Sequence, residues 1–147
     1  HGIVPRSVSG LTGILFAPWL HGDFAHLTAN TVPFAVLGLL IMLRGPKVFL
    51  GVSVFITIVG GGAVWLIARS ANHIGASGVV FGYLGFLVAV GIVERRLTSI
   101  LASALVGFAY GGLIWGVLPN QPGVSWESHL FGALAGVAAA RVFARRK

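Results

Sequence analysis

Long apolar runs separated by short polar breaks dominate this chain. Five runs approach the roughly twenty residues that a helix needs to cross the hydrocarbon core of a bilayer. Their expected bounds are residues 25–43, 48–69, 77–93, 97–118 and 126–143. The breaks carry Gly, Pro, Asn or charged residues, which is typical of turns. The pattern therefore predicts an all-α, polytopic helical membrane protein.

Composition and charge placement agree with this prediction. Of the 147 residues, 56% are hydrophobic and only 9% are charged, far fewer than in a soluble domain. Most basic residues fall at alternate breaks, namely Arg44, Lys47, Arg95, Arg96, Arg141, Arg145, Arg146 and Lys147. The positive-inside rule assigns these breaks and the C-terminus to the cytoplasm. The net charge of +7 is thus explained by membrane topology, and we expect no nucleic-acid partner.

The first 24 residues predict a different kind of segment. The apolar stretch from Leu11 to Leu20 is short and is interrupted by Gly13 and Pro18. We expect residues 1–24 to form an external loop that lies at the membrane interface. Because the sequence starts with His1 on the external side, we also expect it to be a fragment that lacks an upstream span.

The sequence lacks the residues that several classes of catalytic and metal-binding site require. The chain has no cysteine, which excludes a thiolate metal site and a cysteine nucleophile. The only acids are Asp23, Glu94 and Glu127, and they are not placed as a pair of catalytic carboxylates. No H-E-x-x-H motif of a zinc protease occurs either. We therefore expect no metal and no cofactor.

Polar residues gather at the starts of three spans that run in the same direction. They are His21, His26 and Asn30, then His73 and Ser77, then Glu127, Ser128 and His129. Ionisable and nucleophilic groups inside a membrane are costly and mark functional sites. We expect these three helix starts to line a pocket open to external water. His21 and His73 are interpreted as loop or rim residues without a role.

Glycine spacing predicts close contact between two of these spans. The pairs are Gly78 with Gly82 and Gly132 with Gly136. Small residues four apart let membrane helices approach closely. Because His129 shares a helical face with Gly132, docking of the two ridges would bring it near Ser77.

Plainer interpretations of the same residues stay open at this point. Glycine ridges also occur in ordinary helix packing, and a serine at a helix start is usually a cap. His26 and Asn30 could simply hydrogen-bond across helices. A histidine cluster could be the proton relay of a small ion-coupled carrier, although no paired internal repeat supports that function.

Taken in order, the motifs resemble the rhomboid family of intramembrane serine proteases. Gly75-Ala76-Ser77-Gly78 matches the G-x-S-G nucleophile motif, and the segment from His129 to Gly136 matches H-x-x-G-x-x-x-G. His21, His26 and Asn30 match the histidine-rich entry to the second span of the family. The resemblance covers essentially the whole chain.

The resemblance implies a six-helix core, of which the first span is absent here. It also implies a Ser77–His129 dyad, with Ser77 as nucleophile and His129 as general base. His26, Asn30 and the backbone N–H of Ser77 would form the oxyanion hole, and Gly75 would permit the tight turn before Ser77. The expected substrates are transmembrane segments of membrane proteins, cleaved near the outer interface. The alternative is an inactive rhomboid-like protein that binds client helices in the bilayer.

Two positions depart from the common pattern of the family. Phe81 stands where relatives often carry a tyrosine, and residues 1–24 lack the usual tryptophan–arginine pair. No buried acid is expected to hold the tautomer of His129, so slow turnover is predicted. A compact core without soluble extensions suggests a prokaryotic plasma membrane.

Overall fold

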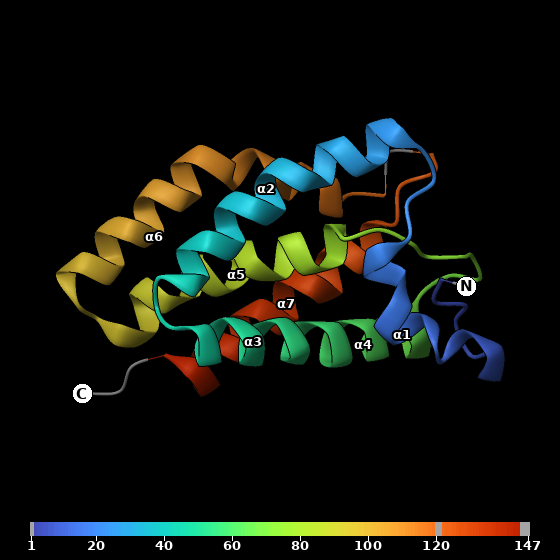
Figure 1. The fold of residues 1–147 in the computed structure, drawn as a ribbon, viewed down its shortest axis with the longest axis horizontal. Helices are drawn as coiled ribbons and strands as arrows, with labels where there is room; N and C mark the ends of the chain where they lie inside the picture. Colours follow the sequence, from blue (N-terminus) through green and yellow to red (C-terminus); the bar gives the residue numbers. More distant parts are fainter. Residues whose placement is uncertain (1, 120–121, 145–147) are drawn as a thin grey trace.

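The computed structural model describes residues 2–119 and 122–144, which form a bundle of helices (Figure 1). His1, Arg145, Arg146 and Lys147 lie outside these residues. A short N-terminal segment holds η1 (Val8–Gly10), α1 (Gly13–Phe16) and η2 (Ala17–Trp19). The bundle consists of α2 (Phe24–Met42), α3 (Pro46–Phe55), η3 (Ile56–Gly60), α4 (Gly61–Ile67), α5 (Ser77–Glu94), α6 (Leu97–Tyr110), η4 (Gly111–Val117) and α7 (Trp126–Phe143). The predicted all-α fold is confirmed.

Local sequence signals explain where the helices begin and end. The Asp23 side chain caps α2 by accepting a 2.7 Å hydrogen bond from the backbone N–H of His26. Gly45, with φ of 125°, makes the turn before Pro46 opens α3. At the end of α5, Arg95 takes the left-handed conformation that stops a helix, with φ of 53°. Pro33 lies inside α2 without ending it.

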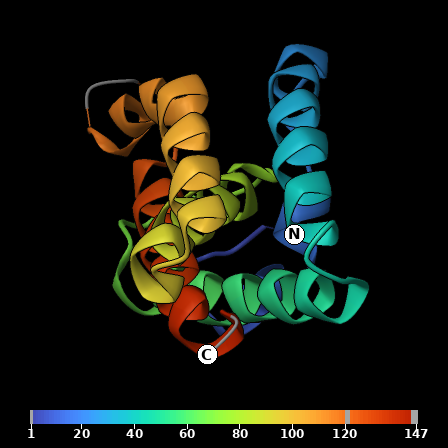
Figure 2. The same ribbon diagram turned by 90° about the vertical axis from the view of Figure 1, so that its left-hand side faces the viewer.

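The three helices α2, α5 and α7 all begin at the end of the bundle that carries the N-terminal segment (Figure 1). The continuous helix from α3 through η3 to α4 returns in the opposite direction, as does α6 with η4. Figure 2 shows these helices arranged around α5. Accordingly, 67% of the residues of α5 are buried, against 22% and 6% in 18-residue windows of α2 and of the helix Leu97–Val117. The helix that starts at Ser77 is therefore the centre of the bundle.

Among the described residues, four helices are long and apolar enough to cross a membrane. They are Phe24–Met42, Pro46–Ile67, Ser77–Glu94 and Leu97–Val117. Helix α7 is not among them, since it carries Glu127, Ser128 and His129 in its first turn and Arg141 in its last. That α7 crosses the bilayer thus stays a prediction.

A buried ion pair joins three helix ends at the end of the bundle away from the N-terminal segment. Arg44, just after α2, pairs with Glu94, the last residue of α5. Ser99, in the first turn of α6, also donates to the Glu94 carboxylate. The Arg44 guanidinium lies 5.8 Å from the ring centre of Phe86. Because Glu94 is buried, these contacts compensate a charge that would otherwise be costly.

At the opposite end, the N-terminal segment is fastened to the loop between α4 and α5. The backbones of Ile3 and His73 exchange two hydrogen bonds of 2.9 Å. Gly75 N–H donates to the Ala17 carbonyl at 2.9 Å. The Trp65 indole donates to the Ser7 carbonyl at 2.8 Å. The loop that leads into Ser77 is therefore tied on one side to the N-terminal segment.

Helices α5 and α7 approach until their backbones touch. A Cβ added at Gly132 would lie 2.0 Å from the Gly78 carbonyl oxygen, and one at Gly136 would lie 1.9 Å from that of Gly82. No side chain fits in these positions. Gly82 itself faces Ile56 of the π-helical turn η3, where an added Cβ would lie 2.4 Å from a methyl carbon. Glycine on both helices thus permits the closest packing in the core.

Candidate active site

Ser77 is the first residue of α5, and the turn before it depends on glycine. Gly75 has a φ of 113°, a conformation that residues with a side chain rarely adopt. As the first helical residue, Ser77 has a backbone N–H without an acceptor inside its own helix. The positive end of the α5 dipole lies here as well. The start of α5 can therefore stabilise negative charge that develops beside Ser77.

His129, in the first turn of α7, is buried and held in one tautomer. Its Nδ1 lies 2.7 Å from the carbonyl oxygen of Gly116. A carbonyl only accepts hydrogen bonds, so Nδ1 carries the proton and Nε2 of the neutral ring has a free lone pair. The ring also stacks on Phe81, with 4.1 Å between centroids and 5° between planes. This arrangement leaves Nε2 able to accept a proton.

Gly116 is a part of the site that the sequence reasoning missed. A Cβ added there would lie 2.8 Å from Phe81 Cζ and 3.0 Å from His129 Nδ1. The carbonyl can therefore reach the imidazole only because residue 116 has no side chain. The sequence offers a single signal, a glycine inside an apolar run, and that signal does not reveal a carbonyl acceptor.

The starts of α5 and α7 lie against each other, which brings the Ser77 and His129 segments together. Gly78, next to Ser77, faces the carbonyl of Ser128, which precedes His129; an added Cβ would lie 3.3 Å from that oxygen. Within the described part of the chain, Ser77 Oγ makes no hydrogen bond to His129. Catalytic hydrogen bonds are often long or poorly aligned before substrate binds.

His26, in the first turn of α2, has the opposite tautomer to His129. Its Nδ1 accepts from the backbone N–H of Gly22 at 3.4 Å, so Nε2 of the neutral ring carries the hydrogen. A Cβ added at Gly75 would lie 2.6 Å from His26 Nε2 and 3.7 Å from Ser77 Oγ. Both atoms therefore border the same space beside Gly75, and His26 presents a donor to it.

Asn30 lies one turn further along α2 and is buried. Its Nδ2 donates at 2.8 Å to the His26 carbonyl within the same helix, which leaves the second amide hydrogen for another acceptor. Asn30 and Ala76 both line a cavity of about 540 Å³ between α2, α3 and α5. Its walls are mostly apolar.

Other polar residues from the sequence prediction have different surroundings. His21 is half-buried, and its ring meets that of His26 edge-on at 5.1 Å. Glu127 is buried and pairs with Arg69 at 3.5 Å instead of orienting His129. His73 lies in the loop between α4 and α5, as one of the two expected placements had it, but it is not a rim residue, because only 2% of it is exposed. In the described part of the chain, no three His, Asp or Glu side chains converge as metal ligands.

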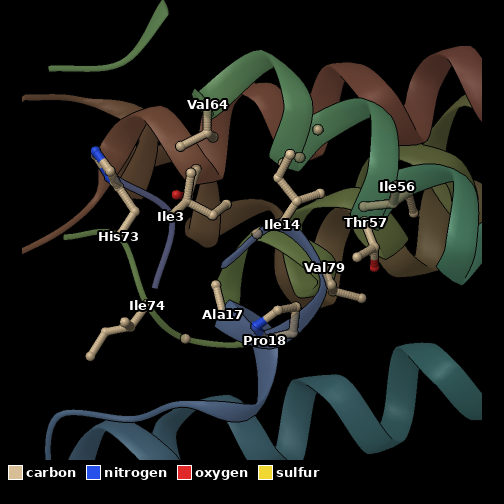
Figure 3. Close-up of a pocket in the computed structure, with 16 residues that line it drawn as sticks. Ile3, Ile14, Ala17, Pro18, Ile56, Thr57, Val64, His73, Ile74 and Val79 are labelled. Atoms are coloured by element: carbon tan, nitrogen blue, oxygen red, sulfur yellow. The ribbon is translucent and has the colours of Figure 1, made fainter. Parts of the chain in front are cut away.

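A second, smaller cavity of about 40 Å³ lies behind the loop that leads to Ser77. Figure 3 shows Ala17 and Pro18 of the N-terminal segment on one side of it and Val64 of α4 on another. Gly75, Gly78 and Ser128 also line it. The wall nearest Ser77 is thus formed by segments that are distant in sequence.

Comparison with known proteins then decides the family. A family model described as the rhomboid domain matches residues 9–146. The chain belongs to the rhomboid family. The nucleophile motif, the histidine motif and the contact between their helices all fall within the matched residues. Its membership of the rhomboid family and its long apolar helices show that it is an integral membrane protein.

Similar proteins occur in bacteria and plants. This rhomboid is 44% identical to an uncharacterized protein of Mycobacterium tuberculosis, over 95% of the chain and 62% of that relative. It is 47% identical to an uncharacterized protein of Mycobacterium leprae, over 95% of the chain and 59% of that relative. RHOMBOID-like protein 5 of Arabidopsis thaliana is 30% identical, over 80% of the chain and 39% of that protein.

The chain thus spans about three fifths of the length of its mycobacterial relatives. No solved structure matches it significantly. The mycobacterial relatives point to a prokaryotic source for this rhomboid.

Proposed function

We propose that this rhomboid is an intramembrane serine endopeptidase that cleaves transmembrane segments of membrane proteins near the outer interface. Ser77 is the nucleophile and His129 the general base. His26, Asn30 and the Ser77 backbone N–H donate to the oxyanion. The proposed orientation has the starts of α2, α5 and α7 on the external side of a prokaryotic plasma membrane and the C-terminus in the cytoplasm.

The observation that carries this proposal is the opposite hydrogen bonding of two histidines, His26 near Ser77 and His129 on the helix that packs against the helix of Ser77. Nδ1 of His129 donates to the Gly116 carbonyl, which leaves Nε2 as an acceptor. Nδ1 of His26 accepts from Gly22 N–H, which leaves Nε2–H as a donor. A serine hydrolase needs an acceptor for the hydroxyl proton and a donor for the oxyanion. The two rings meet these two needs.

The proposed reaction follows from these roles. Ser77 Oγ attacks the scissile carbonyl carbon while His129 Nε2 takes the hydroxyl proton. His26 Nε2–H, the remaining Asn30 amide hydrogen and Ser77 N–H stabilise the oxyanion at the start of α5. His129 then gives its proton to the leaving amine, and water hydrolyses the acyl-enzyme by the same groups. The neutral carbonyl of Gly116 orients the His129 ring.

The lipid surroundings limit which peptide bonds the proposed protease can reach. A helix in lipid satisfies its backbone hydrogen bonds internally, so its peptide bonds become accessible only where the helix unwinds. We expect cleavage in segments weakened by glycine or other poor helix formers near the outer interface.

The test is cleavage of a transmembrane substrate by the full-length protein in liposomes. Ser77→Ala and His129→Ala should each abolish cleavage, because they remove the nucleophile and the base. The same variants should lose labelling of Ser77 by a fluorophosphonate probe. Ser9→Ala, an exposed change in the N-terminal segment, is the control and should cleave normally.

Two results would contradict the assignment. Undiminished cleavage by Ser77→Ala would exclude Ser77 as the nucleophile. A folded wild-type protein that binds transmembrane helices but neither cleaves nor takes the probe would favour the inactive, client-binding alternative.

A further inference from the structure

His73 is a buried histidine to which the proposed mechanism gives no part. It lies in the loop between α4 and α5, four residues before Ser77, and is 2% exposed. Figure 3 shows it at the edge of the small cavity, with its ring turned away from Ile14 and Val79. A buried imidazole without partners would be destabilising, so its contacts need an explanation.

Those contacts are a series of hydrogen bonds that runs from His73 to α7. His73 Nε2 lies 3.1 Å from the Arg69 carbonyl and therefore donates to it. In the neutral ring Nδ1 is then an acceptor, and it lies 2.6 Å from Ser125 Oγ. Ser125 Oγ in turn lies 2.7 Å from Ser128 Oγ and accepts from Ser128 N–H at 3.4 Å. A hydroxyl that caps α7 thus also donates to the loop of Ser77.

These hydrogen bonds lie close in sequence to both residues of the proposed Ser77–His129 dyad. His73 precedes Ser77 by one short loop, and Ser125 precedes His129 by one helical turn. The His73 backbone is paired with Ile3, so its side chain alone reaches toward α7. The His73–Ser125 bond therefore joins the segment that ends in Ser77 to the segment that begins with His129.

A second link between these two segments joins Arg69 to the start of α7. The Arg69 guanidinium pairs with Glu127 at 3.5 Å and donates to the Val124 carbonyl at 2.8 Å, and the Arg69 backbone N–H donates to Glu127 Oε1 at 3.4 Å. Glu127 is buried, but the Arg69 side chain is 48% exposed, so water and salt screen its charge. The His73 ring is buried, so its hydrogen bond to Ser125 is not screened in this way.

We propose that His73 and Ser125 are positioning residues that hold the loop of Ser77 in register with the first turn of α7. This inference rests on the proposed function, since the relative position of the Ser77 loop and α7 is important only if Ser77 and His129 react together. The glycine contacts fix α5 against α7 from Gly78 inward, whereas Ser77 lies at the very edge of that interface. Beyond it, the His73–Ser125 bond sets the separation. Misplacement by 1 Å can cost about a hundredfold in rate.

The test compares variants that break the link with variants that keep it. His73→Leu removes both ring nitrogens at similar volume, and Ser125→Ala removes the hydroxyl. His73→Asn retains an acceptor toward Ser125, and Ser125→Thr retains the donor. Asn72→Ala, an exposed neighbour of His73, is the control. The readouts on the full-length protein are kcat and KM for a transmembrane substrate, the rate and final extent of fluorophosphonate labelling, and the melting temperature.

His73→Leu and Ser125→Ala should each lower kcat and the labelling rate by about 10- to 100-fold, with KM and the final labelled fraction nearly unchanged. The double variant should be no slower than the slower single variant, because both break one bond. His73→Asn and Ser125→Thr should recover most of the rate. Wild-type labelling rates in both broken variants, or a loss explained wholly by a smaller labelled fraction, would overturn the proposal.

A measurement without catalysis separates this inference from the proposed function. The chain has no cysteine, so spin labels can be placed at Asn72→Cys and Pro122→Cys, on the two joined segments. His73→Leu should broaden the distance distribution between them, and His73→Asn should not. An unchanged distribution would refute the positioning role even if the enzyme is active. A broadened one in a protein that neither labels nor cleaves would uphold the link and contradict the protease assignment.

Discussion

At the scale of single residues, two histidines acquire opposite hydrogen-bonding roles from the backbone groups that they meet. A carbonyl at Gly116 makes His129 Nδ1 a donor, and an amide at Gly22 makes His26 Nδ1 an acceptor. The remaining nitrogen of each ring takes the complementary role. The hydrogen-bonding roles of the two rings thus depend on main-chain geometry as much as on side-chain identity.

Gly116→Ala tests the importance of the carbonyl contact. The added methyl would lie 3.0 Å from His129 Nδ1 and 2.8 Å from Phe81 Cζ, so the imidazole must move. We expect kcat to fall by about 10- to 100-fold while the melting temperature changes little. The control is Gly112→Ala in the same η4 helix, where an added Cβ meets nothing within 4 Å. Equal activity of the two variants would show that the carbonyl does not orient His129.

The sequence predicted the side chains of the candidate site but not the backbone groups that they contact. The motifs around Ser77 and His129 nominated the residues of the candidate site. They did not nominate Gly116, because any residue type has a carbonyl and only the fold shows which one faces the ring. They also did not indicate that the loop residue His73 is buried, because its burial depends on the distant N-terminal segment that pairs with it.

At the scale of elements, the contact between α5 and α7 depends on positions without side chains. Hydropathy and glycine spacing predicted both helices, because the period of small residues is visible in sequence. Hydropathy could not predict the π-helical turn Ile56–Gly60 or the 3₁₀ helix Gly111–Val117. Both are apolar runs whose hydrogen-bond pattern is set by packing and not by composition.

Gly132→Ala should loosen this contact. Its methyl would lie 2.0 Å from the Gly78 carbonyl oxygen, a backbone atom that cannot move aside alone. Separating the helices should cost about 1–3 kcal/mol or more of the free energy of unfolding, and the melting temperature should fall. Gly62→Ala in α4 is the control, with nothing within 4 Å of the added methyl, and it should be neutral or stabilising. Comparable melting of the two variants would contradict close packing at Gly132.

At the scale of the whole molecule, the two ends of the bundle differ in chemistry. One end carries the N-terminal segment, the polar helix starts and the candidate site. The other carries Arg44, Arg95 and Arg96, with the buried pair of Arg44 and Glu94 among them. The charge pattern along the sequence anticipated this division, but not the pairing of Arg44, because a contact between separate loops leaves no local signal.

The proposed orientation predicts which end meets external water. Since the chain has no cysteine, a single one can be introduced at Ser9 or at Arg96, both exposed and at opposite ends. In intact cells, a membrane-impermeant maleimide should label Ser9→Cys at once and Arg96→Cys only after permeabilisation. The reverse pattern would place the candidate site on the cytoplasmic face.

The placement of His129 on α7, two helices after Ser77, has a consequence for biosynthesis. A ribosome delivers Ser77 and Phe81 well before it delivers α7, which must still slide into place against the glycines of α5. On the proposed mechanism, a nascent or truncated chain that ends before Trp126 holds a hydroxyl with no partner to deprotonate it. On this mechanism, membrane proteins that are inserted nearby are not cleaved until α7 has been synthesised and has packed against α5.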